Sequence, residues 1–220
     1  KRKKIRAAVE TFRDEIRTEY GTLDPGIRIE AQWAGKDREE GEEELRIAFT
    51  RKDSLRMVRF LMALPNGVIE YSRDYPEVPQ TSLSLGIVKT MADGIRTHSL
   101  VRSSIDSQKK FIMDRIDCIA AAFGASVETN GAYPGWQYLR DSSFRNLAAD
   151  VYRDVTGRDM KICVIHGGLE CGLLAAKVPG LDCISIGPDM EGVHTPAERL
   201  NIPSTARTYA YLRALLEACV

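Results

Sequence analysis

Three histidines are the side chains in this sequence best suited to chemistry, and each has a different setting. His98 stands in an alternation of polar and apolar residues typical of a strand, where histidine more often packs or forms hydrogen bonds than catalyses. His166 directly follows the apolar run 162–165. His194 follows a second apolar run and precedes Glu198 by four residues, so the carboxylate can orient the imidazole. His166 and His194 are therefore the candidates for a site.

Two glycines, Gly167 and Gly168, separate the first apolar run from a short predicted helix over 169–177. A strand that ends in Gly-Gly before a helix exposes backbone N–H groups at the carboxyl edge of a parallel sheet, where anions and oxyanions are commonly held. The same two residues also suit a tight turn that needs glycine for steric reasons alone. Because His194 also follows a predicted strand, we expect both loops to meet at one sheet edge.

Two catalytic chemistries are open at this edge. A catalytic zinc ion needs several nitrogen and oxygen donors and an open position, and His194 is the one well-placed donor, so the residues alone do not establish a metal site. Cys171 lies near the start of the short helix with His166 close in sequence, which defines a cysteine-nucleophile hypothesis. The five cysteines show no paired spacing, and a single cysteine at such a position is more often a small buried hydrophobic residue.

Arg102 is a lone cation between apolar residues of a predicted strand. It is either an exposed strand arginine or a fork that grips a carboxylate.

Across the 220 residues, 31 basic and 31 acidic residues give a formal net charge of zero, so the chain has no bulk attraction for nucleic acid or an anionic membrane. No run approaches the roughly 18 apolar residues that cross a bilayer. We expect a cytoplasmic protein with no nucleic-acid and no membrane partner.

The first 131 residues contain the elements of an α+β sandwich with largely antiparallel strands. Asp93-Gly94 predicts a type I′ hairpin. Asp53 or Ser54 and then Asp106 are predicted helix caps. The acidic loop 36–43 is expected to be mobile. The predicted helices are 1–20, about 53–64 and 106–123, and the predicted strands are 27–33, 45–49, 68–71, 81–90, 95–104 and 125–129.

After Trp136 the pattern changes to alternating helix and strand, which predicts a parallel sheet and a partial α/β domain over 132–220. Two strands are too few for such a sheet covered on both faces. We therefore expect the missing strands to come from chain N-terminal to Lys1 or from another subunit. The predicted elements are helix 142–156, strand 161–165, helix 169–177, strand 182–186 and helix 204–218.

Six motifs in this order resemble the aminoacyl-histidine dipeptidases, the carnosinase-like branch of the dinuclear-zinc metallopeptidases. The resemblance runs from about Pro65 to the C-terminus, and residues 1–64 match only in pattern. The motifs are Thr81–Gly86, Leu100–Ser107, Gly131–Trp136, His166–Gly172, Ser185–Pro188 and His194–Leu200.

The resemblance implies a zinc-binding catalytic domain interrupted by a lid domain that usually mediates dimerisation. Residues 1–131 would be most of the lid and 132–220 the final third of the catalytic domain. Two zinc ions, or other divalent metals, would serve one active site, but most of their ligands and the general-base glutamate have no counterpart in this chain. We expect the intact protein to hydrolyse dipeptides such as Xaa-His as a homodimer, and these residues alone to be inactive, with no catalytic residue of their own.

Residue by residue, the resemblance assigns His194 as a zinc ligand and Glu198 as the acidic residue that follows it. Arg102 matches the lid arginine that holds the substrate carboxylate. Gly167 and Gly168 match the turn that lines the substrate site.

Three further positions are candidates, and two other readings stay open. Ser84 stands where the family has asparagine, and one hydroxyl cannot reproduce both amide contacts. His166 and Glu170 belong to the same motif as the two glycines.

One alternative function is a non-catalytic dimerisation module from a truncated relative, whose exposed sheet edges drive association. The other is a hydrolase that uses Cys171 as its nucleophile.

Overall fold

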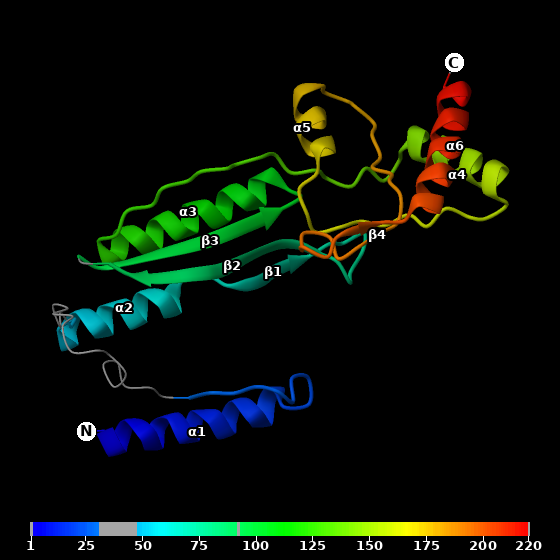
Figure 1. Cartoon of the computed structure of the whole chain (residues 1–220). Helices are drawn as coiled ribbons and strands as arrows, with labels where there is room; N and C mark the ends of the chain where they lie inside the picture. Colours follow the sequence, from blue (N-terminus) through cyan, green and yellow to red (C-terminus); the bar gives the residue numbers. More distant parts are fainter. Residues whose placement is uncertain (1, 31–47, 92, 220) are drawn as a thin grey trace, which may run out of the picture. The chain divides into compact units, whose positions relative to one another are not determined.

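The computed structural model describes residues 2–30, 48–91 and 93–219, and the chain forms two compact units, Lys1–Ala48 and Phe49–Val220 (Figure 1). In the first unit, α1 (Arg2–Tyr20) confirms the predicted helix and its end at Gly21. A Cβ at Gly21 would lie 2.4 Å from the carbonyl oxygen of Arg17, so glycine is required there. The described parts of the two predicted early strands, 27–30 and 48–49, are not strands. Their remainder and the acidic loop 36–43 lie outside the described residues.

Helix α2 (Arg51–Ala63) begins earlier than predicted, because Thr50 and not Asp53 or Ser54 is its cap. The Thr50 hydroxyl oxygen accepts from the backbone N–H of Asp53 at 3.1 Å and donates to the Asp53 carboxylate at 2.6 Å. A threonine three residues before an acidic residue is a common helix start, in which the threonine hydroxyl accepts from the backbone N–H of the acidic residue. The prediction missed that pairing and chose the acidic residue itself.

Strands β1 (Gly67–Tyr71), β2 (Pro79–Thr90) and β3 (Ile95–Ser103) form one antiparallel sheet in the order β1-β2-β3. The predicted β2–β3 hairpin is confirmed, but Asp93-Gly94 does not form the predicted type I′ turn. Residues 91–94 connect the paired Thr90 and Ile95, and Gly94 does not have a positive φ. A two-residue type I′ turn needs a positive φ at both central residues, and Gly94, the second predicted central residue, instead accepts a hydrogen bond at its carbonyl from the Met91 backbone N–H at 2.9 Å.

Helix α3 (Asp106–Phe123) packs along β3 and against α2 (Figure 1). Phe60 of α2 meets Phe123 edge to face, with ring centroids 5.7 Å apart. The predicted end of α3 is confirmed, since Gly124 has φ +63° and accepts the left-handed conformation that glycine tolerates best. The start differs, because Ile105 precedes the helix without a side-chain cap and Asp106 is the first helical residue. The buried residues of this layer include Leu64, Leu83, Ile112 and Ala120.

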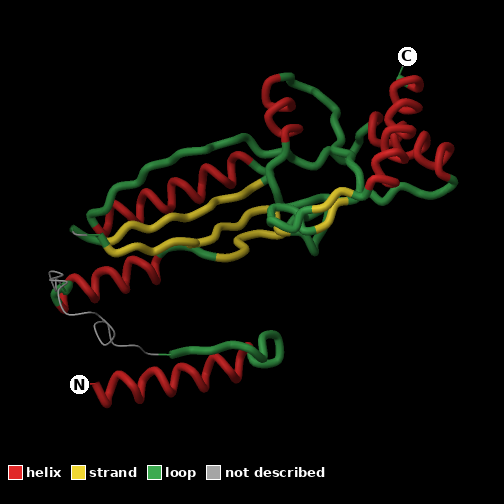
Figure 2. Tube along the Cα trace, viewed as in Figure 1, coloured by secondary structure: helices red, strands yellow, loops and turns green. Residues whose placement is uncertain are grey.

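The segment after Gly124 runs back along α3 as an extended chain that pairs with no described strand (Figure 2). The predicted strand 125–129 is therefore wrong. Contacts to the start of α3, and not a β-ladder, hold the end of this segment. The backbone N–H of Gly135 donates to the Asp106 carboxylate at 2.8 Å.

Helices α4 (Ser143–Thr156) and α6 (Ile202–Ala218) pack together around Ala148, Tyr211 and Leu215, all of which are buried. The Tyr211 hydroxyl donates to the carbonyl of Ala148 at 2.9 Å. The predicted helices over 142–156 and 204–218 are confirmed, the second beginning at Ile202 behind the Asn201 cap. This helix pair is the main core of residues 142–219.

The two predicted parallel strands, 161–165 and 182–186, are not formed in the described part of the chain. A strand is defined by hydrogen bonds to a neighbour, and no described strand lies beside either segment. Ile162, Ile165 and Ile186 are exposed as a result. Between these segments, α5 (Glu170–Lys177) confirms the predicted short helix. Beyond them, β4 (Met190–Glu191) and β5 (Arg199–Leu200) form a short antiparallel pair.

The described chain is thus a mixed helix and sheet structure with antiparallel sheets, as expected for the first region. The division into domains at residue 131 stays a prediction. None of the described helices is long and apolar enough to cross a membrane.

Candidate functional site

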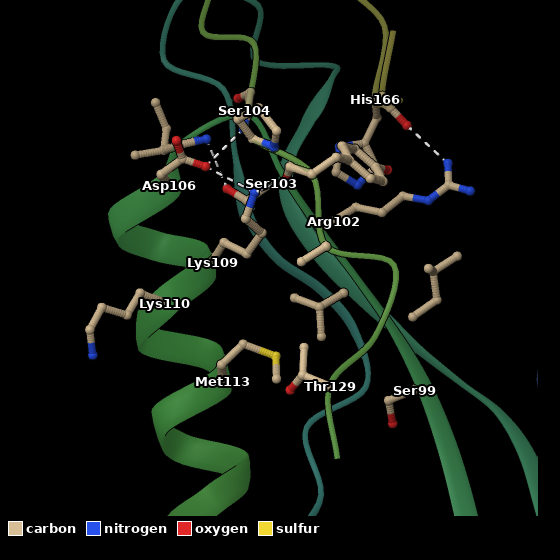
Figure 3. Close-up of a pocket in the computed structure, with 18 of the residues that line it drawn as sticks. Ser99, Arg102, Ser103, Ser104, Asp106, Lys109, Lys110, Met113, Thr129 and His166 are labelled. Atoms are coloured by element: carbon tan, nitrogen blue, oxygen red, sulfur yellow. Dashed lines mark hydrogen bonds and ion pairs between the residues drawn. The ribbon is translucent and has the colours of Figure 1, made fainter. Parts of the chain in front are cut away.

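A cavity of about 700 Å³ lies between β3, α3 and the extended segment that follows α3 (Figure 3). Residues 164–168 also line this cavity, so the predicted Gly-Gly turn and the predicted arginine meet at one place. Arg102, His166, Gly167 and Gly168 all belong to its lining. The sequence had brought Arg102 to the Gly-Gly turn only through the resemblance.

The pairing of β2 with β3 places Ser82 directly opposite Arg102. Directly opposed residues project from the same face of an antiparallel sheet. Both reach the same residue: the Ser82 hydroxyl and the His166 Nε2 share a hydrogen bond of 2.6 Å, and Arg102 Nη1 donates to the His166 carbonyl at 3.3 Å. One pair of strand residues therefore holds His166 by its side chain and by its backbone.

Arg102 keeps most of its hydrogen-bonding capacity for a ligand. A guanidinium group carries five N–H donors, and the contact with His166 uses one nitrogen. The side chain is exposed at the cavity, so its charge is accessible. This geometry suits the predicted role of a fork for a carboxylate.

His166 is half-buried, and its pKa lies below the ordinary value of 6.5. Burial is the main cause, since it disfavours the charged imidazolium, and the positive charge of Arg102 lowers the pKa further. A hydrogen bond to the backbone of Pro79 acts in the opposite direction. The imidazole is consequently neutral at neutral pH, and Arg102 remains the cation of this pair.

Gly168 is a position where the structure requires the absence of a side chain. A Cβ there would lie 2.2 Å from Cε2 of the Tyr133 ring, whereas a Cβ at Gly167 would meet only Ile165 Cδ1 at 3.5 Å. The aromatic ring of Tyr133 therefore lies against the backbone of the Gly-Gly turn. Steric crowding therefore requires glycine at position 168. At position 167 no described atom lies close enough to exclude a side chain.

A lysine at the start of α3 anchors Tyr133. Lys109 Nζ donates to the Tyr133 carbonyl at 2.6 Å and pairs with the Asp106 carboxylate at 2.9 Å. The hydrogen bond from Lys109 is the main cause that lowers the pKa of Asp106, and the bond from Gly135 adds to it. Asp106 is thus not the predicted cap of α3 but the acceptor that holds residues 133–135 against that helix.

His194 lies elsewhere in the described chain, in the turn between β4 and β5, and does not line the cavity. Its φ is +65°, a left-handed conformation that is uncommon for a residue other than glycine. Glu198 stabilises this backbone, because its carboxylate accepts from the His194 backbone N–H at 2.8 Å. Glu198 therefore contacts the backbone of His194, whereas the sequence suggested contact with the imidazole.

The donors needed for a metal ion do not come together within the described residues. Among them, no group of three or more histidine, cysteine, aspartate or glutamate side chains is arranged to hold one. Zinc is almost always held by at least three protein ligands. Within the described residues, His194 and its neighbours do not complete a metal site.

The remaining sequence candidates occupy separate places. Ser84 is exposed on β2 opposite Leu100, and Glu170 is the exposed first residue of α5. The Cys171 thiol donates to the Ile184 carbonyl at 3.7 Å, while the His166 imidazole bonds to Ser82. The cysteine-nucleophile hypothesis needs His166 as the base for Cys171. The His166 imidazole is instead hydrogen-bonded to Ser82.

Sequence reasoning missed Ser82, Tyr133 and Lys109. For Ser82 a signal was present, because it precedes the candidate Ser84 by two residues and so shares its strand face. Tyr133 and Lys109 carried no local signal, since their partners lie far away in the sequence and on other elements.

The comparisons with known proteins point to peptidases. No protein-family model matches the chain. It is 32% identical over 213 residues to the cytosol non-specific dipeptidase of Escherichia coli (strain K12), which covers 97% of this chain. The crystal structure of an aminoacylhistidine dipeptidase from Vibrio alginolyticus matches 98% of this chain with a TM-score of 0.80 and 32% identity. The class that these matches define is that of dipeptidases.

The match extends over less than half of either dipeptidase, since the chain spans 42% of the length of each. A third protein, the aminopeptidase PepT from Bacillus cereus, shares 19% identity and a TM-score of 0.59 over 75% of this chain. That likeness shows a shared fold only. The resemblance inferred from the six motifs is confirmed at the level of sequence similarity to dipeptidases.

Proposed function

We propose that these 220 residues are part of a dipeptidase that hydrolyses short peptides, including dipeptides with a C-terminal histidine. The observation that carries the proposal is the 32% identity to a dipeptidase along 97% of the chain. The cavity supports it, because a dipeptide has a free carboxylate and Arg102 presents a guanidinium group in a space large enough for a small ligand.

Within this proposal, Arg102 binds the carboxylate of the substrate through charge-assisted hydrogen bonds. Gly167 and Gly168 line the pocket with backbone. His166 is held between the Ser82 hydroxyl and Arg102, so that it borders the same space as a neutral hydrogen-bonding group. These residues bind and orient a substrate, and none of them is proposed to catalyse the hydrolysis.

The proposed organisation keeps residues 1–131 as the lid and 132–220 as the end of the catalytic domain, with homodimerisation through the lid. A bound zinc, or another divalent metal, would polarise the scissile carbonyl and activate water. His194 would supply one ligand in a turn stabilised by Glu198, and further ligands would have to come from outside the described residues. We therefore expect the isolated chain not to hydrolyse dipeptides.

The proposal is tested on the natural polypeptide that contains this sequence. Its mass is measured, and its hydrolysis of dipeptides ending in histidine is assayed before and after chelation, with metal added back. We expect turnover that disappears with chelator and returns with zinc. A natural polypeptide that dimerises and shows no turnover with any dipeptide and any divalent metal would instead support the non-catalytic dimerisation module.

A further inference from the structure

Two cysteines outside the cavity lining approach each other between α5 and the segment that follows it. The Cys171 thiol donates to the carbonyl of Ile184 at 3.7 Å, and the Cys183 thiol donates to the carbonyl of Cys171 at 3.9 Å. Each sulfur thus contacts the backbone of the segment that carries the other. Disulfides join cysteines whose backbones lie close together, and these reciprocal contacts bring the two cysteine-bearing segments next to each other.

The same two cysteines differ from the other three in their surroundings. Cys171 and Cys183 are half-buried, whereas Cys118, Cys163 and Cys219 are exposed. Burial raises the pKa of the Cys183 thiol, as does the neighbouring Cys171, while a hydrogen bond from Trp136 lowers it. The raised pKa favours the protonated thiol form of Cys183.

The first turn of α5 is firmly seated, which keeps Cys171 in place. Gly172 is buried, and a Cβ there would lie 3.3 Å from both the Pro134 carbonyl oxygen and the Trp136 Cβ. The helix start is therefore packed against residues 134–136, beside the Gly-Gly turn that precedes it. A covalent bond at Cys171 would act on a well-ordered element.

We propose that Cys171 and Cys183 form a reversible disulfide, a modification site that ties the first turn of α5 to residues 182–186. With hydrogen peroxide as oxidant, the Cys171 thiolate attacks one oxygen, the O–O bond breaks, and a sulfenic acid and one water form after proton transfer. The Cys183 thiol then attacks the sulfenic sulfur, the S–S bond forms, and the second water leaves. Two thiols are oxidised by two electrons, and one peroxide is reduced to two waters.

The bridge is independent of the proposed peptidase function and is tested on the full 220-residue chain. A variant with Cys118→Ser, Cys163→Ser and Cys219→Ser retains only the two half-buried thiols. After stoichiometric peroxide we expect both thiols to become unreactive toward iodoacetamide, the intact mass to fall by about two hydrogen masses, and dithiothreitol to restore both. Peptide mapping should then find the segments that contain Cys171 and Cys183 joined.

A spectroscopic readout follows the same bond without removing any cysteine. In a Trp33→Phe variant, Trp136 is the remaining tryptophan, and a disulfide beside an indole quenches its fluorescence. We expect peroxide to lower this fluorescence and dithiothreitol to restore it, and we expect Cys183→Ser to abolish the change. The proposal is wrong if oxidation of the unsubstituted chain gives sulfinic acid on Cys171, or bridges to the exposed cysteines, without a joined Cys171–Cys183 peptide.

Discussion

Ser82 and Arg102 lie directly opposite each other in the β2–β3 pairing, and both form hydrogen bonds with His166. Ser82 contacts the imidazole, and Arg102 contacts the backbone carbonyl. Two strands of the antiparallel sheet thereby hold the residue that precedes the Gly-Gly turn. Because Ser82 and His166 are 84 positions apart, this contact also joins the region proposed as the lid to the region proposed as catalytic.

The first prediction concerns the charge of Arg102. In the 220-residue chain, Arg102→Ala should weaken the binding of a dipeptide ending in histidine by about 10- to 100-fold, because a hydrogen bond to a charged group contributes roughly 1.5–3 kcal/mol. Arg102→Lys should retain part of the affinity, since a point charge replaces the fork. Ligand titration followed by NMR measures the dissociation constants.

Arg96 provides the matched control for Arg102. It is an exposed arginine on the same strand, and six residues of separation keep it on the same face. Arg96→Ala should leave the affinity unchanged. Equal weakening by both substitutions would mean that net charge, and not a carboxylate site at Arg102, governs binding.

The second prediction concerns the Gly-Gly turn. Gly168→Ala should lower the free energy of unfolding by about 1–3 kcal/mol, because its methyl group would overlap the Tyr133 ring. Gly167→Ala should change it by no more than about 0.5 kcal/mol, since that methyl group meets only ordinary contacts. Urea unfolding of both variants gives the comparison.

A double-variant cycle identifies the cause of the Gly168 effect. In a Tyr133→Ala background the added methyl group has no ring to meet, so Gly168→Ala should become nearly neutral. An undiminished loss of stability in that background would show that the glycine is needed for its backbone and not for the space under Tyr133.

The third prediction is a pH dependence that originates at His166. Because the pKa of His166 is lowered in the folded chain, the unfolded chain binds more protons between that lowered pKa and 6.5. The contribution of His166 to stability is therefore complete above pH 6.5 and is lost as the pH falls through this window. His166→Gln should remove that part of the slope when the free energy of unfolding is measured against pH.

Arg102 is one cause of that shift, so Arg102→Gln should raise the pKa of His166. The titration of the imidazole Cε1 proton, followed by NMR and assigned with His166→Gln, measures this change. Arg96→Gln serves as the control and should leave the titration where it is. An unchanged His166 pKa in Arg102→Gln would indicate that burial alone lowers it.

The fourth prediction concerns the start of α4. Ser142 is buried and donates to the Asp182 carboxylate at 2.7 Å, and the Phe144 backbone N–H donates to the same carboxylate at 3.0 Å. Asp182→Ala should lower the free energy of unfolding by about 1–3 kcal/mol, because it leaves two donors unsatisfied. The control is Asp154→Ala, at an exposed position of α4, which should change the free energy of unfolding by no more than about 0.5 kcal/mol. Urea unfolding measures both variants.

The elements that could be predicted from the residues alone are those whose signals are local. The apolar stripe of α1, the glycine that ends α3, and the two long strands of the β2–β3 hairpin could each be recognised within a few neighbouring residues. Helices close their hydrogen bonds within their own segment, and hairpin strands pair with the next segment along the chain. The motifs also led correctly to sequence similarity with dipeptidases.

Features that depend on partners distant in the sequence could not be predicted and became visible in the folded chain. Residues 161–165 and 182–186 have strand-like composition, yet a strand needs a neighbour to bond with, and the Asp182 carboxylate instead accepts hydrogen bonds from the start of α4. The hydrogen bond between Ser82 and His166, and the ring of Tyr133 over Gly168, join elements that no local pattern relates. Two side chains that are distant in the sequence can touch only if the backbone segments that carry them are placed next to each other. The packing of the whole chain sets that placement.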